Sequence, residues 1–190
     1  MRRLRIFSVL VMLLALAGAG SASATAAQKT AAAPYCGITW GSLPKSAGSL
    51  STNSLLKVTT SRQSCYDRTV YEFTGAVSGY RVEYTDHVIT DGEGLDVTPY
   101  TAGGAHLDVV LLAPVYKTDG TVTYNRKLGD HAVNVVRYQT LRDILYAGSF
   151  EGYTQFDQGV RAKLPFRVTV ATGTDGHGRI TVDVAHQWEQ

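Results

Sequence analysis

Sequence motifs for metal binding and for nucleophilic catalysis are missing from this chain of 190 residues. The five histidines are dispersed, without the H-x-x-x-H or C-x-x-C spacings from which zinc sites are built. Residues 75–79, GAVSG, resemble a nucleophile elbow, but the serine stands one position too late. No glycine-rich phosphate loop is present either. The sequence therefore predicts no catalytic residue, no metal ligand and no cofactor.

An excess of charge of one sign is also missing. Lys and Arg number 18, Asp and Glu number 16, and the basic side chains are scattered singly along the chain. Nucleic acids and acidic membranes attract proteins through clustered basic groups. We therefore expect neither a nucleic acid nor a polybasic membrane contact among the partners.

The one long apolar run, 6–17, is shorter than the roughly 20 residues that a membrane span needs. Three arginines precede this run, and Ala22-Ser23-Ala24 follows it in the A-x-A cleavage pattern. We interpret 1–24 as the signal peptide of an exported protein, with a membrane anchor as the alternative and the export route, general secretory or twin-arginine, left open. Its removal changes the formal charge from 18 − 16 = +2 to 15 − 16 = −1.

Cysteine is scarce, since the chain has only Cys36 and Cys65. In an exported protein such a pair favours one disulfide, and closing a loop of about thirty residues contributes about 3–4 kcal/mol in the chain-entropy model. A lipid anchor at Cys36 is disfavoured because the bulky Tyr35 precedes it. The small residues of 25–35 predict a flexible leader, after which we expect Trp40 to anchor the following loop in the core.

Helical periodicity is rare, and short segments of alternating apolar and polar residues take its place. The clearest segment has Ile180, Val182 and Val184 on one side and polar residues on the other. Such segments, separated by Gly, Asp or Pro clusters, predict an all-β domain over 36–190, a β-sandwich or barrel of about seven or eight strands. One short helix is predicted at 140–148, where a near capping box, an apolar face and a final glycine follow one another.

A hairpin is predicted in the stretch FEGYTQFDQGVRAKLPFRV, residues 150–168. Its tip is placed at 157–159, with Gly159 at positive φ in a three-residue loop. Glu151 would then face a basic residue of the second strand across the hairpin.

Two acidic stretches invite a functional interpretation. The stretch DGEGLDV, 91–97, imitates one calcium-binding nonapeptide repeat, but such repeats work in tandem, so a plain loop is favoured. Asp67, beside Arg68, is an active carboxylate in one interpretation. Hydrogen bonds or ion pairs at the rim of the sandwich are the favoured one, because no partner acid or base stands at a catalytic spacing.

Five blocks of the sequence resemble the AMIN-like domain of exported bacterial envelope proteins, a domain named for the AMIN module found beside cell-wall amidases and secretins. The blocks are CGITWGSLPK, CYDRTVYEFTG, GYRVEYTD, GSFEGYTQFDQGVRAKLPFRV and ITVDVAHQW, and they span most of the chain after the leader. The resemblance implies a β-sandwich for targeting or peptidoglycan binding, without agreed catalytic residues. In one departure, Arg62-Gln63-Ser64 stands where the family commonly has a basic segment with histidine, so any role of that histidine is absent.

The function that we expect is that of a secreted, wall-associated binding module whose partner is cell-wall glycan or an envelope protein. Tyr153, Gln155 and Arg161, if outward-facing on adjacent strands, would offer a stacking ring, an amide and a guanidinium to a sugar. One alternative is a small-molecule carrier, which would have a hollow interior. The other is an enzyme, which would have a buried acid pair in a cleft.

Overall fold

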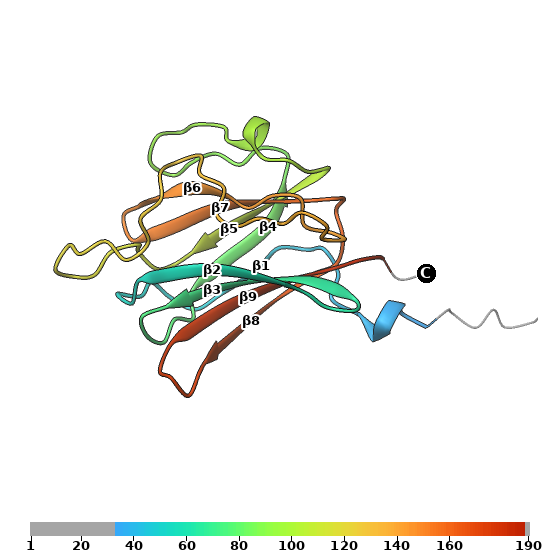
Figure 1. Ribbon diagram of the computed structural model, residues 1–190, viewed down its shortest axis with the longest axis horizontal. Helices are drawn as coiled ribbons and strands as arrows, with labels where there is room; N and C mark the ends of the chain where they lie inside the picture. The colour runs from blue at the N-terminus through green and yellow to red at the C-terminus, as the bar shows by residue number, and fades with distance from the viewer. Residues whose placement is uncertain (1–32, 189–190) are drawn as a thin grey trace, which may run out of the picture. The chain divides into compact units, whose positions relative to one another are not determined.

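Nine strands in two antiparallel sheets make up the part of the chain that the computed structural model describes, residues 33–188 (Figure 1). The strands are β1 (Lys45–Ala47), β2 (Leu55–Arg62), β3 (Tyr66–Phe73), β4 (Tyr80–Thr85), β5 (Ala105–Leu111), β6 (Leu145–Phe150), β7 (Tyr153–Val160), β8 (Phe166–Thr172) and β9 (Gly178–Ala185). Two 3-10 turns, η1 (Tyr35–Gly37) and η2 (Thr98–Tyr100), are the helical elements of these residues. None of their helices is long and apolar enough to cross a membrane.

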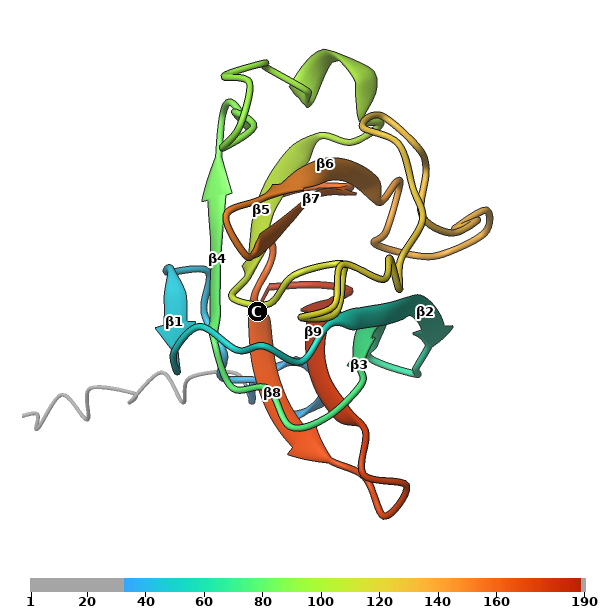
Figure 2. The ribbon, with the colours of Figure 1, turned by 90° about the vertical axis from the view of Figure 1, so that its left-hand side faces the viewer.

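The sheets stack as two layers, which confirms the predicted β-sandwich (Figure 2). One sheet has the order β1-β4-β5-β7-β6 and the other the order β2-β3-β9-β8. Two long connections, 86–104 and 112–144, run outside the strands. These connections matter for function because they supply side chains to the candidate site.

The core lies between the two sheets and is built by the alternation seen in the sequence. Ile180, Val182 and Val184 of β9 are fully buried, as predicted. Phe156 of β7 packs against Tyr71 of β3, with ring centroids 5.1 Å apart. Burying a large apolar side chain contributes about 1.5–3 kcal/mol. Aromatic and aliphatic side chains fill the space between the sheets, and their burial stabilises the sandwich.

Residues 140–148 form no helix, so the helix predicted there is wrong. Leu141 makes a bridge to Val160, and β6 begins at Leu145 and pairs with β7. Gly148, expected to end the helix, lies with φ 113° at an irregularity in this pairing. The apolar spacing that favoured a helix also suits an irregular segment followed by a buried strand, and pairing with β7 decides between them.

The tip of the β6–β7 hairpin lies at 151–152, not at 157–159 as predicted. Glu151 and Gly152 have φ values of 47° and 86°, as a tight two-residue turn requires, whereas β7 runs uninterrupted through Gly159. Gly159 is a strand residue without positive φ. Glu151 and Arg161 therefore flank opposite ends of β7, and the expected ion pair across the hairpin does not form.

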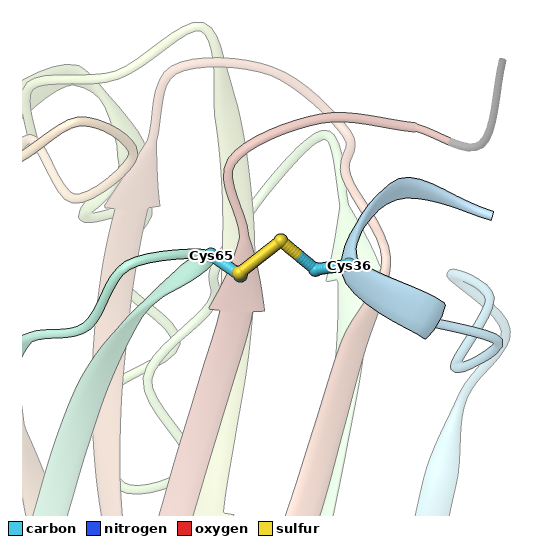
Figure 3. The surroundings of a disulfide bond; sticks show 2 residues. All are labelled: Cys36 and Cys65. Atoms are coloured by element: carbon cyan, nitrogen blue, oxygen red, sulfur yellow. A yellow bond between two sulfur atoms is a disulfide. The ribbon is translucent and has the colours of Figure 1, made fainter.

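Cys36 and Cys65 form the predicted disulfide (Figure 3). Their Cα atoms lie 6.2 Å apart, and the bond links η1 to the residue before β3. The N-terminal segment is thereby fixed to the four-stranded sheet.

Trp40 lies outside the core, contrary to expectation. Its ring meets that of Tyr66 edge-on, with centroids 5.4 Å apart, and the Arg167 guanidinium lies 4.3 Å from its ring centroid. Tyr66 is on the outer face of β3, since side chains alternate along a strand and Tyr71 faces the core. Trp40 thus anchors the N-terminal loop to the outside of the sheet through a cation–π contact.

Removing the disulfide is expected to lower the free energy of unfolding by about 3 kcal/mol, because the unfolded chain gains loop entropy. Urea unfolding of the double variant Cys36→Ser and Cys65→Ser measures the loss. The native chain should show the same loss in a reductant, whereas the variant should not respond to it. An unchanged midpoint in the variant would contradict this role of the bond.

Candidate functional site

The candidate site is a pocket of about 440 Å³ beside the β6–β7 hairpin, which we call the hairpin pocket. Three segments distant in sequence line it: the 90–93 loop, the 112–144 connection and the hairpin itself. The residues that carry its chemistry are Asp91, Glu93, Arg126, Phe150, Tyr153 and Gln155.

Two of the three predicted site residues, Tyr153 and Gln155, line this pocket together. They lie on the face of β7 opposite to Phe156, which points into the core. Tyr153 is half-buried, whereas only 4% of Gln155 is exposed.

The amide of Gln155 is a clamp. Its Nε2 donates to the carbonyl of Ile89 at 3.0 Å and to Asp108 Oδ1 at 2.9 Å, and its Oε1 accepts from the backbone N–H of Asp91 at 3.2 Å. Both amide protons are therefore used within the protein. Gln155 thereby holds the backbone of residues 89–91 against the sheet. Asp91 and Glu93 of the same loop line the pocket.

Arg161, the third predicted residue, lies elsewhere. It follows the C-terminal end of β7, about 26 Å along the strand from Tyr153 at the usual rise per residue. It is exposed, and its guanidinium donates to the carbonyl of His186. The structure thus brings together Tyr153 and Gln155 but separates Arg161 from both.

Arg126 supplies the guanidinium of the pocket, and the sequence analysis missed it. It lies in the 112–144 connection, where no period of two or of 3.6 marks which residues face a strand. The aromatic density of the stretch 150–168 was the available signal for Phe150, which is 47% exposed. Gly92 packs against it, since an added Cβ there would lie 3.2 Å from the Phe150 ring.

Acidic side chains also line or adjoin the hairpin pocket. Asp91 and Glu93 lie in an exposed turn, and Asp108 lies behind Gln155. Burial raises the pKa of Asp108 to about 6; the hydrogen bond from Gln155 lowers the pKa, whereas the charges of Asp91 and Glu83 raise it. The carboxyl of Asp108 is therefore mostly ionised at neutral pH and becomes protonated as the pH falls below about 6.

The stretch 91–97 is a loop, as favoured from the sequence. Asp96 lies 2.7 Å from His87 Nδ1 and accepts a hydrogen bond from the N–H of Thr98 at 3.0 Å, and these hydrogen bonds lower its pKa. Within residues 33–188, no group of three or more His, Cys, Asp or Glu side chains is placed to hold a metal ion.

Asp67 and Arg68 make the structural contacts that the sequence analysis favoured. Arg68 pairs with Asp183 through Nε and Nη2, at 2.7 and 2.9 Å. Asp67 is fully buried and accepts hydrogen bonds from the N–H groups of Thr140 and Leu141. The carboxylates of Asp67 and Asp183 are thus both bound to groups of the protein itself.

A family model of the AMIN-like domain matches residues 53–186. The chain belongs to the AMIN-like domain family. The match runs from just before β2 to just after β9, so it contains eight of the nine described strands and the whole hairpin pocket. Domains of this family are non-catalytic modules of the cell envelope. No curated protein and no solved structure matches this chain.

The disulfide joins a residue outside the matched range, Cys36, to one inside it, Cys65. Disulfides persist in oxidising compartments. This bond and the family agree on a location outside the cytoplasm.

Proposed function

We propose that this protein is an exported, non-enzymatic binding module that holds cell-wall glycan, such as peptidoglycan, in the hairpin pocket. The observation that carries the proposal is the meeting of Phe150 and Tyr153 with Arg126 and two carboxylates, those of Asp91 and Glu93, around one open pocket. Its volume of about 440 Å³ lies within the range of ligand sites.

Each group in the pocket suits one feature of a wall glycan. The rings of Phe150 and Tyr153 offer flat apolar faces to the C–H faces of a sugar ring. The carboxylates of Asp91 and Glu93 accept hydrogen bonds from hydroxyl and amide N–H groups. Arg126 donates to amide carbonyls or to a carboxylate. A ligand that combines sugar rings, amides and carboxylates uses all of these groups at once.

The packed interior supports an outer site over the small-molecule carrier. Tyr71, Phe156 and Tyr146 fill the space that a carrier would leave for its ligand, and all three are buried.

The acids of the five-stranded sheet support a binding module over an enzyme. Asp108 and Asp157 stand opposite each other on β5 and β7, but they face different partners. Asp108 accepts from Gln155, and Asp157 lies 3.0 Å from His106 Nδ1. The carboxyls of Asp108 and Asp157 are therefore arranged as separate structural contacts, and the family adds that its domains are non-catalytic.

Replacing Arg126 and Tyr153 together with alanine is expected to lower retention on insoluble peptidoglycan at least about tenfold, a loss of about 1.4 kcal/mol or more. The stacking ring and the guanidinium are both lost, while the clamp made by Gln155 stays in place. A pull-down of the exported protein over a range of peptidoglycan amounts measures the change.

The matched control is the double variant Arg161→Ala and Tyr100→Ala, which removes one exposed guanidinium and one tyrosine that is 72% exposed, both outside the pocket. It should bind like the native chain. Equal retention by the two double variants, both folded by circular dichroism, would reject the hairpin pocket. Failure of the native chain to bind would reject glycan recognition itself.

A further inference from the structure

The outer face of the four-stranded sheet carries two clusters of charged side chains, and the first of them is balanced. Arg179 contacts the carboxylates of both Glu72 and Asp175. Lys57 and His177 also contact Glu72, each at 3.1 Å. Two permanent bases therefore meet two acids, and each acid is paired within the protein. This cluster has no charge left to offer to a ligand.

The second cluster has one base in excess. Asp183 of β9 stands opposite Arg68 of β3 on one side and Arg167 of β8 on the other, and both guanidinium groups bind its carboxylate. The side chain of Asp183 is 1% exposed, whereas those of Arg68 and Arg167 are 31% and 37% exposed. No other carboxylate of residues 33–188 pairs with either arginine. The acid is thus covered, and two bases with one acid leave one positive charge at the surface.

Arg167 has hydrogen-bond donors to spare. Its Nε donates to Asp183 Oδ2 at 2.9 Å, and within residues 33–188 its two Nη atoms make no hydrogen bond. These two atoms carry four N–H groups in one plane. The edge that they form is a fork that can give two parallel hydrogen bonds to a carboxylate. Arg167 is therefore able to bind one carboxylate while it stays paired with Asp183.

The free end of Arg167 is held in place before any ligand arrives. Its guanidinium lies 4.3 Å from the ring centroid of Trp40 and 5.3 Å from that of Tyr66, and both rings are partly exposed. The Cys36–Cys65 disulfide ties the Trp40 loop to the residue before Tyr66. A side chain that is already ordered loses less entropy on binding. Two rings and an oriented guanidinium therefore form a rigid surface.

We propose that this surface is a second ligand site, which binds a uronic acid, a sugar with a carboxylate on its ring. Arg167 holds the carboxylate by its fork, and the exposed parts of Trp40 and Tyr66 contact the apolar C–H groups of the sugar. The single excess charge matches the single charge of a carboxylate. A phosphate monoester carries about −1.5 to −2 and would leave charge without a partner.

This site is independent of the hairpin pocket. It lies on the four-stranded sheet and the loop before β1, whereas the hairpin pocket lies beside β6 of the other sheet, and the two share no residue. Binding at one site therefore does not require binding at the other. A chain with both sites could hold an acidic glycan and a second wall glycan at once.

Titration of the exported protein with glucuronate, followed by NMR, tests the proposal at the residues themselves. The Nε–H signal of Arg167 and the indole N–H signal of Trp40 should shift together and reach saturation. Glucose has the same ring without the carboxylate, and N-acetylalanine has a carboxylate without the ring. Each should bind at least about tenfold more weakly at these two signals. Glucose 6-phosphate should bind no more tightly than glucuronate, because its second charge has no partner.

Arg167→Gln removes the fork and should weaken the binding of glucuronate at least about tenfold. Asp183 keeps its two hydrogen bonds from Arg68 in this variant, so the fold should be retained, which circular dichroism checks. The matched control is Arg179→Gln, on the same face of the sheet but in the balanced cluster. It should bind glucuronate like the native chain.

Four outcomes would overturn the proposal. The first is the absence of saturable shifts at Arg167 and Trp40, and the second is a folded Arg167→Gln variant that binds like the native chain. The latter would leave Arg167 only its contact with the Trp40 loop. Equal affinity for glucose or N-acetylalanine would reject a uronic acid, and tighter binding of glucose 6-phosphate would reject a carboxylate. The variant without Arg126 and Tyr153 should bind glucuronate here unchanged, so a failure of the hairpin pocket is recognised separately.

Discussion

Replacing Gly159 with valine is expected to cost about 4 kcal/mol or more of folding free energy, enough to unfold many domains. A Cβ at this strand position would lie 2.0 Å from the carbonyl oxygen of Ala102 and 2.9 Å from Cγ2 of Thr101. Real Cβ atoms essentially never come so close to a backbone oxygen, so the 102–104 segment would have to move.

That segment has little freedom to move. Ala102 donates its N–H to Asp143 Oδ2, and Gly104 donates to the carbonyl of Val160. The carbonyl of Gly159 itself accepts from the N–H groups of Arg142 and Asp143. Displacing either segment therefore breaks several hydrogen bonds at once, each with a penalty when its groups stay buried.

Urea unfolding of Gly159→Val, with Ser46→Val as the control, measures the cost. Ser46 is an exposed residue of β1, where a valine should change stability by less than about 0.5 kcal/mol. Gly159→Asn separates the two explanations for this glycine. Asparagine tolerates positive φ, so it would be accepted in a turn, but its Cβ meets Ala102 as that of valine does. A mild effect of asparagine would mean that close approach is not the reason for the glycine.

Gly159 also shows where prediction from the sequence ends. The local pattern Asp-Gln-Gly favoured a turn because it is typical of one, and the true turn residues, Glu151 and Gly152, lie only a few positions earlier. The reason for Gly159 is the carbonyl of Ala102, in a connection far away in the sequence. No local pattern contains that contact.

The parts of the fold that the sequence did predict are those with local causes. Alternation marked β9 because one face of the strand is buried along its whole length, through Ile180, Val182 and Val184. The disulfide followed from the count of cysteines. The helix predicted for 140–148 was wrong because its apolar residues fit either a helix or an irregular segment followed by a buried strand. Only pairing with β7 distinguishes the two.

The residues of the candidate site also fall into two groups, those with a local signal in the sequence and those whose role depends on distant segments. Tyr153 could be found because aromatic residues beside charges are visible in the sequence. Arg126 could not, since a long irregular connection brings it to the pocket. Gln155 was predicted as a ligand-binding residue because of its amide. Its function as a clamp, however, depends on Ile89 and Asp108, which lie on other segments.

Replacing Asp67 with alanine is the second change with a large expected effect, a loss of about 3–5 kcal/mol. Asp67 is fully buried, and its Oδ2 accepts the N–H groups of Thr140 and Leu141. Its Oδ1 lies 3.1 Å from Nε2 of His186, which is 2% exposed. Alanine would leave two backbone donors and a histidine buried without this acceptor.

The exposed Asp119 provides the matched control. Its carboxylate also accepts a backbone N–H, from Thr121 at 2.9 Å, but water can replace that acceptor once the side chain is removed. Asp119→Ala should therefore cost less than about 1 kcal/mol in the same urea titration. Asp67→Asn should fall between the two, because its amide oxygen replaces one carboxylate oxygen as an acceptor but not both.

The same variants decide whether Asp67 belongs to the fold or to a ligand site. If it only stabilises the fold, Asp67→Asn should lose stability yet keep native retention on peptidoglycan at a temperature where it stays folded. A variant of native stability with lost retention would assign Asp67 to binding.

Thr140 and Leu141 begin the segment that the sequence misassigned as a helix, and their N–H groups point to the carboxylate of Asp67. The buried acid on β3 therefore helps to hold 140–144 extended, and Asp67→Ala should release that segment first, seen as faster amide exchange at Thr140 and Leu141 than at Val182 in the core.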